Sequence, residues 1–118
     1  MGKVLKDFDT MLNDLKKMSA VERIHSANSH NAAGKEANYV VSDIISFMYE
    51  IYDYTLPSSI VSGYIVDYTN RFLDTTKQQV LLESDEQERE RLNQRKEALI
   101  KVRNLMFAPD DKIVAGRK

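Results

Sequence analysis

Cysteine is absent from this chain of 118 residues. Disulfide bonds, thiolate zinc sites and cysteine nucleophiles are therefore excluded. Histidine is scarce, with His25 and His30 as the two representatives. They stand five positions apart and fall on different faces of a helix, so they do not form the i,i+4 pair of a zinc-binding helix. We therefore expect no metal ion and no cofactor.

The chain also lacks a strong net charge and a long uninterrupted apolar run. Its formal net charge is −1, which gives no overall attraction to nucleic acid or anionic lipid. The most apolar run is interrupted by Ser42, Asp43, Ser46 and Glu50, which argues against a membrane span. The N-terminal residues alternate in charge, so we expect no signal peptide. These features favour a cytoplasmic protein without a membrane partner.

The segment Tyr39–Tyr54 organises the rest of the chain. Its apolar residues cover most of a helical circumference, and its polar residues recur every three or four positions instead of alternating as in a strand. The polar residues are Ser42, Asp43, Ser46, Glu50 and Asp53. A helix that is apolar on all but one stripe is surrounded by other elements. We therefore expect it to be the central helix of a bundle.

Apolar periodicity and capping residues predict the remaining helices. Capping boxes at Ser19 and Ser84 predict two helix starts, and Pro57 marks a break after the central helix. The expected helices are Lys3–Met18, Ser19 to about Ala33, Lys35–Tyr54, Ser59–Asp74 and Ser84 to about Phe107. The segment 75–83 either continues the fourth helix or forms a turn. The predicted fold is all-α, an antiparallel bundle of four or five helices with a long C-terminal helix. Residues 1–107 form its one domain and 108–118 a tail.

The last two helices have distinct apolar patterns. The buried stripe expected for the fourth helix consists of Ile60, Val61, Tyr64, Ile65, Tyr68 and Phe72. The fifth helix offers Leu92, Leu99, Val102 and Met106 to the core. Its first half, Asp85–Arg91, has no apolar residue, so we expect that half to project into solvent or to pair with another molecule.

Carboxylates offer two alternatives with catalytic chemistry. Glu22 and His25 have the Glu-x-x-His spacing of di-iron bundles, which need a second such motif that the chain lacks. The pairs Glu50-x-x-Asp53 and Glu83-x-x-Glu86 resemble, in reverse order, the acidic motifs of all-α nucleotide pyrophosphatases of the MazG type. That resemblance implies a magnesium-dependent nucleotide hydrolase. No nucleophile, base and oxyanion donors can be assembled from the spacings, so we expect no enzyme.

Basic residues on the fifth helix offer a second alternative, a nucleic-acid-binding regulatory protein. They are Arg89, Arg91, Arg95, Lys96, Lys101 and Arg103. Acidic residues of the same segment offset them, namely Glu83, Asp85, Glu86, Glu88, Glu90 and Glu97. Binding to phosphates needs an uncompensated basic face, so nucleic acid is an unlikely partner.

Tyrosine is the most informative residue type. All six tyrosines lie between Tyr39 and Tyr68. We interpret Tyr52, Tyr64 and Tyr68 as packing residues with the hydroxyl at the rim. The others stand near the acidic stripe of the central helix, a combination typical of protein-binding surfaces. The predicted partner-binding residues are Tyr39, Asp43, Tyr49, Glu50, Asp53 and Tyr54.

Short segments resemble two families of small helical proteins. Asp43-Ile44-Ile45, Asp67-Tyr68 with Arg71 and Leu73, and Val102-Arg103 resemble the helices of flagellar export chaperones. Leu56-Pro57-Ser58-Ser59 before an amphipathic helix resembles bacteriocin immunity proteins. We assign the chain to neither family. Both resemblances imply a helical protein that binds another protein.

The favoured function is therefore non-enzymatic, as an adaptor, inhibitor, chaperone or immunity-type protein that acts through protein contacts. The end of the fourth helix and the start of the fifth predict self-association as well. Apolar residues there supply most of the affinity, while Glu86 and Glu90 of one chain face Arg95 of another. The predicted self-association residues are Val80, Leu81, Leu82, Glu86, Glu90 and Arg95. The expected species is a homodimer.

Overall fold

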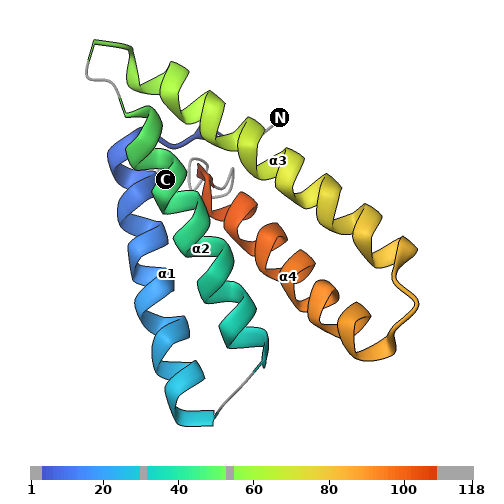
Figure 1. The fold of residues 1–118 in the computed structure, drawn as a ribbon. Helices are drawn as coiled ribbons and strands as arrows, with labels where there is room; N and C mark the ends of the chain where they lie inside the picture. The colour runs from blue at the N-terminus through green and yellow to red at the C-terminus, as the bar shows by residue number, and fades with distance from the viewer. Residues whose placement is uncertain (1–3, 30–31, 53–54, 109–118) are drawn as a thin grey trace, which may run out of the picture.

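The computed structural model describes residues 4–29, 32–52 and 55–108, with side chains outside 21–29 and 32–34. Within them, four helices pack against one another (Figure 1). They are α1 (Phe8–Ser29), α2 (Ala32–Ile51), α3 (Ser58–Leu82) and α4 (Glu86–Leu105). The strands β1 (Val4–Leu5) and β2 (Phe107–Ala108) have two residues each. The prediction of an all-α fold with four or five helices is confirmed, with four helices described. The longest of them is α3, with 25 residues.

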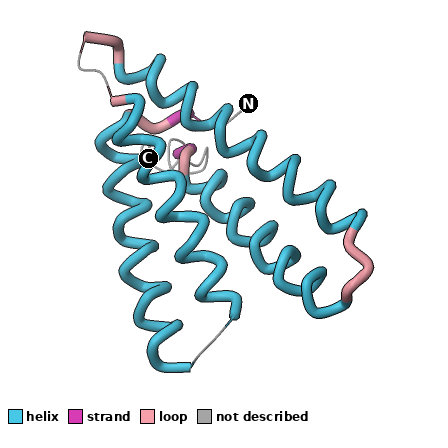
Figure 2. Tube along the Cα trace, in the orientation of Figure 1, coloured by secondary structure: helices cyan, strands magenta, loops and turns pink. Residues whose placement is uncertain are grey.

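The helices lie in a row in the order α1, α2, α4 and α3 (Figures 1 and 2). Helices α1 and α2 form one hairpin, and α3 and α4 form a second that diverges from the first. Because α4 packs against both α2 and α3, the helix α3 stands at one edge of the molecule. The central helix of the sequence prediction, α2, lies between α1 and α4.

One hydrophobic core joins all four helices. Its fully buried apolar side chains include Met11, Leu15, Val40, Val41, Ile44, Met48, Ile65, Leu99, Val102 and Met106. Each such side chain contributes roughly 1.5–3 kcal/mol when it leaves water. The α4 residues predicted for the core, Leu92, Leu99, Val102 and Met106, are all buried.

The first helix begins later than predicted, because Val4 and Leu5 form β1. This strand pairs antiparallel with β2, with Val4 opposite Ala108 and Leu5 opposite Phe107. Asp7 then caps α1, since its Oδ1 accepts a hydrogen bond from Thr10 N at 2.8 Å. That bond lowers the pKa of the Asp7 carboxyl.

The predicted break at Ser19 is absent, because α1 runs without interruption through Phe8–Ser29. Ser19 is buried against α2, and its hydroxyl donates to Asn38 Oδ1 at 3.2 Å. A hydroxyl that finds a partner on a neighbouring helix fits inside a helix without breaking it. The Ser19 motif is therefore an internal contact and not a capping box.

The segment left open by the sequence, 75–83, continues α3 as far as Leu82. The cap of α3 is Pro57 and not Ser58 or Ser59. Ser58 instead accepts a hydrogen bond from Phe8 N at 2.8 Å and so ties α3 to the start of α1.

At the other end of the hairpin, α4 is capped by Asp85 and not by the predicted Ser84. The Asp85 side chain accepts from Gln87 N at 3.1 Å. The Arg89 guanidinium donates to the carbonyl of Glu83, at the end of α3, at 2.9 and 3.1 Å. This cation satisfies a carbonyl at the negative end of the α3 dipole.

The buried stripe of α3 is rotated relative to the prediction. Val61 and Ile65 are buried as predicted, but Ile60 and Tyr64 are exposed. The buried set is Val61, Ser62, Ile65, Thr69, Leu73 and Thr76. Thr69 and Thr76 tolerate burial because their hydroxyls donate at 2.9 Å to carbonyls one turn earlier. Of the other residues predicted for the stripe, Tyr68 and Phe72 therefore face α2, while Ile60 and Tyr64 face solvent.

Candidate functional site: the groove between α2 and α3

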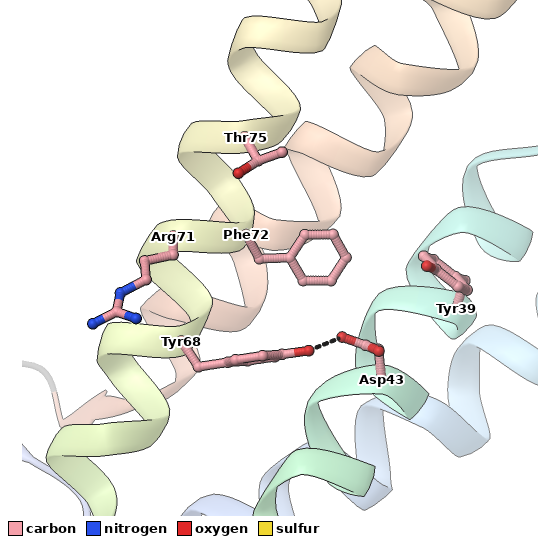
Figure 3. A pocket seen from close by; sticks show the side chains of 6 residues that line it. All are labelled: Tyr39, Asp43, Tyr68, Arg71, Phe72 and Thr75. Atoms are coloured by element: carbon pink, nitrogen blue, oxygen red, sulfur yellow. Dashed lines mark hydrogen bonds between the residues drawn. The ribbon is translucent and has the colours of Figure 1, made fainter.

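A groove of about 440 Å³ runs between α2 and α3 (Figure 3). It exists because α2 and α3 each pack against α4 more than against each other, so their facing sides do not close. The lining residues are Tyr39 and Asp43 from α2 and Tyr68, Arg71, Phe72 and Thr75 from α3. A concave surface with an apolar lining and a few polar groups is the usual form of a recognition site.

Aromatic rings form the walls of the groove. The Phe47 ring stacks on Tyr68 with the centroids 3.9 Å apart and the planes 7° from parallel. Phe72 meets Tyr39 and Tyr68 edge to face, with centroid separations of 6.4 and 6.3 Å. Such pairs add about 0.5–1.5 kcal/mol beyond the area they bury. These contacts fix the positions of the rings within the chain itself.

One polar contact crosses the groove. The Tyr68 hydroxyl donates to Asp43 Oδ2 at 2.6 Å (Figure 3). This hydrogen bond is the main cause that raises the pKa of Tyr68 to about 12, with burial and the charges of Asp43 and Glu50 adding to the effect. Glu50 follows Asp43 by two helical turns in α2, which places both carboxylates on the same side of that helix.

A cluster of charged side chains joins α2 to α4 beside Tyr39, a lining residue of the groove. Glu36 on α2 accepts from Arg95 Nε at 2.8 Å and pairs with Arg91 at 3.3 Å. Arg91 also pairs with Glu88 and lowers the pKa of that carboxyl. The Arg95 guanidinium then lies over the Tyr39 ring, 4.7 Å from its centroid.

This cluster corrects the expectation that the first half of α4 projects into solvent. Glu86, Gln87 and Glu90 are exposed, but Arg91 is half-buried and bonds to α2. Charged side chains make this contact between α2 and α4. The aliphatic stems of long cationic side chains can pack on a neighbouring helix while their charged ends reach a carboxylate.

The structure separates the predicted partner-binding residues into two groups. Tyr39 and Asp43 line the α2–α3 groove, and Glu50 is exposed two helical turns after Asp43. Tyr49 lies on the neighbouring face of α2, in a second depression of about 490 Å³ beside α1, with the Lys16 ammonium 5.5 Å from its ring centroid. Tyr39 and Tyr49 are nevertheless similarly exposed, at 50% and 56%. Asp53 and Tyr54 lie outside the described residues.

Two tyrosines that the sequence assigned to packing are exposed. Tyr64 is 53% exposed because the stripe of α3 is rotated, and Tyr52 is 54% exposed just after α2 ends. The Tyr52 ring still contacts Phe8, with a centroid separation of 5.1 Å. Tyr68 is half-buried, as expected for a packing residue with a polar rim.

The predicted self-association residues are only partly available. Leu81 and Leu82 at the end of α3 are 77% and 82% exposed, and Val80 is half-buried. Glu90 accepts a hydrogen bond from Gln94 at 2.7 Å. Arg95 is engaged by Glu36 and Tyr39 in its own chain.

The acidic motifs considered for catalysis do not converge. Glu50 is near the C-terminal end of α2, while Glu83 and Glu86 flank the α3–α4 loop at the opposite end of the molecule (Figure 1). In the described part of the chain, no group of three or more histidine, aspartate or glutamate side chains is placed to hold a metal ion. The side chains of Glu22 and His25 lie outside that part. None of the described helices is long and apolar enough to cross a membrane.

The sequence pattern did not indicate the α3 residues that line the groove. It assigned Tyr68 and Phe72 to the core and gave no role to Arg71 or Thr75. The available signal was the second stripe of α3, with Thr69, Leu73 and Thr76 at three- and four-residue steps.

Comparison of the chain with family models, with curated proteins and with solved structures gives no significant match. The groove therefore has to be interpreted from its own geometry.

Proposed function

We propose that this chain is a non-enzymatic protein that acts by binding another protein, as an adaptor, inhibitor, chaperone or immunity-type protein. The observation that carries the proposal is the α2–α3 groove, where a half-exposed aromatic surface is held in place from both sides. Grooves between helices receive the apolar face of a partner helix in a recurring mode of recognition. The molecule works, in this proposal, as an antiparallel bundle in the cytoplasm, with residues 1–107 as its domain.

Three features support a binding role for this groove. Tyr39 is half exposed although Arg95 and Phe72 fix its ring, so a partner gains contact area without having to order the side chain. The Tyr68–Asp43 hydrogen bond presets the groove width. Arg71 and Thr75 place polar groups at the rim, the arrangement that surrounds the apolar centre of protein interfaces.

Site-specific photo-cross-linking in cells of the native host tests this proposal. A photoreactive phenylalanine analogue at Thr75 lies at the groove rim, and the same analogue at the exposed Lys17 of α1 is the matched control. We expect Thr75 to give a defined cross-linked product whose mass differs from that of two copies of this chain, and we expect Lys17 not to give it. Equal cross-linking from both positions, or none from Thr75, would contradict the proposal.

Self-association is part of the proposal, with a homodimer as the expected species. Its support is the exposure of Leu81 and Leu82, which are among the most exposed large apolar side chains of the described residues. The mass in solution at about tens of micromolar should be twice that of the chain, and Leu81→Asp with Leu82→Asp should return it to a monomer. A monomer at all concentrations would leave these two leucines as a site for a different protein.

A further inference from the structure

The outward side of α3 has a regular pattern that the monomer does not use. Exposed residues recur at alternating steps of three and four, which places them along one face of the helix. We call this set the α3 seam, and its members are Tyr64, Asp67, Arg71, Asp74, Gln78 and Leu81. At 100° per residue the seam points away from α4, and α3 stands at the edge of the molecule (Figure 1). A second helix therefore has access to it.

We propose that the α3 seam pairs with the α3 seam of a second copy, antiparallel, about a two-fold axis between Phe72 and Leu73. This inference specifies the surface and register of the self-association proposed above. In this register each Arg71 faces Asp74 of the second copy. Each Leu81 packs against Tyr64 of the second copy, and each Asp67 receives the amide of Gln78. The two-fold axis repeats every one of these pairs, as an isologous interface requires.

Gly63 provides room for the same register. It lies inside α3 on the outward side, and a Cβ built on it meets nothing within 4 Å. The register places Leu82 of the second copy over Gly63, beside the exposed Ile60. Leu82 is the most exposed of the large apolar residues described, at 82%, and this contact buries it. A larger side chain at position 63 would hold the two helices apart.

The order of charges favours a second copy over an unrelated partner. Along the seam, Asp67, Arg71 and Asp74 lie between Tyr64 at one end and Leu81 at the other. When two copies align antiparallel, Arg71 of each copy meets Asp74 of the other, and Tyr64 of each meets Leu81 of the other. Asp67 and Arg71 are 69% and 83% exposed and form only a loose pair at 3.7 Å, so both are free to face a partner. Shifting the pairing by one heptad would set Tyr64 against Asp74 and leave Leu81 uncovered, which identifies the preferred register.

A charge-reversal mixing experiment tests the pairing. Arg71→Asp and Asp74→Arg are made as two separate variants, and each alone puts like charges against each other at both central layers. Each variant alone should have a dissociation constant at least about tenfold weaker than that of the wild-type dimer. An equimolar mixture restores opposite charges in every central layer. It should form a heterodimer within about threefold of the wild-type affinity, as measured by sedimentation equilibrium.

Lys17→Asp, a reversal on the exposed face of α1, should leave the wild-type mass unchanged, and circular dichroism checks that every variant is folded. A wild-type monomer at every concentration, single variants that dimerise like wild type, or a mixture that stays monomeric would each overturn the proposal. Arg71 also lies at the rim of the α2–α3 groove, whereas Asp74 does not line it. The cross-link at Thr75 in the Asp74→Arg variant therefore reports on the groove separately from the dimer.

Discussion

Tyr68 of α3 and Asp43 of α2 share the direct hydrogen bond that spans the groove, at 2.6 Å from hydroxyl to carboxylate. The Tyr68 ring is at the same time stacked on Phe47, which follows Asp43 by one helical turn. One side chain therefore fixes the separation of two helices that otherwise pack on α4. Tyr68 thus contacts α2 through both its hydroxyl and its ring.

Tyr68→Phe should lower the free energy of unfolding by about 1 kcal/mol at about pH 8, because the stacked ring is kept and the hydrogen bond to Asp43 is lost. Urea denaturation of both proteins measures the difference. Phe72→Leu cannot serve as a control for the lost hydrogen bond, because it changes the aromatic contacts of Phe72 with Tyr39 and Tyr68. A loss near zero would show that the hydroxyl bonds equally well to water.

The same bond predicts how stability depends on pH. The pKa of Tyr68 is raised to about 12, above the ordinary value of 10.0, so its contribution is complete below pH 10.0 and is lost as the pH rises toward about 12. The difference in stability between wild type and Tyr68→Phe should therefore shrink over this interval. Denaturation curves at several pH values check this, and a constant difference would contradict the assignment.

Glu36→Gln should destabilise the protein by about 1–2 kcal/mol, since Arg95 and Arg91 would lose the one carboxylate that α2 offers them. The Glu36 and Arg95 side chains are only 12% and 16% exposed, so water replaces the lost partner poorly. Glu97→Gln removes a carboxylate at an exposed position of α4 and is the control. Its effect should stay within about 0.5 kcal/mol. Equal effects of the two changes would refute this account.

Ser62→Ala should stabilise the protein by about 1 kcal/mol. The Ser62 hydroxyl is fully buried in α3 and has no hydrogen-bond partner among the described residues. Alanine removes that buried polar group and has the higher helix propensity. Ser46→Ala, at an exposed position of α2, isolates the gain from propensity alone and should give the smaller increase. Thermal denaturation of both variants provides the comparison, and a loss of stability in Ser62→Ala would be inconsistent with an unpaired hydroxyl.

The sequence predicted the fold class and most of the core because apolar periodicity is a local signal. Leu92, Leu99, Val102 and Met106 could be assigned from spacing alone, and they are buried. The pairing of Val4 with Ala108 could not be predicted in this way, since two-residue strands have no periodicity and their partners are far apart in the chain.

The errors have a common physical origin. Ser19 had the pattern of a cap but bonds to Asn38 on the next helix. Thr69 was not part of the predicted stripe of α3, but it is buried and its hydroxyl bonds to the Ile65 carbonyl one turn earlier. In both cases a tertiary or local hydrogen bond decided between two interpretations that the sequence leaves equal. The buried face of α3 includes Thr69 and Thr76, and Tyr64 is left at the surface.

The central claim is that the α2–α3 groove binds the partner. The most direct measurement is the dissociation constant of the protein cross-linked from Thr75 for Tyr39→Ala and for Tyr49→Ala. The two tyrosines are 50% and 56% exposed on neighbouring faces of α2, Tyr39 beside α3 and Tyr49 beside α1, so they differ chiefly in the surface to which they belong. Tyr39→Ala should weaken binding at least about tenfold, while Tyr49→Ala should stay within about twofold. Equal losses, or a larger loss for Tyr49→Ala, would contradict the account.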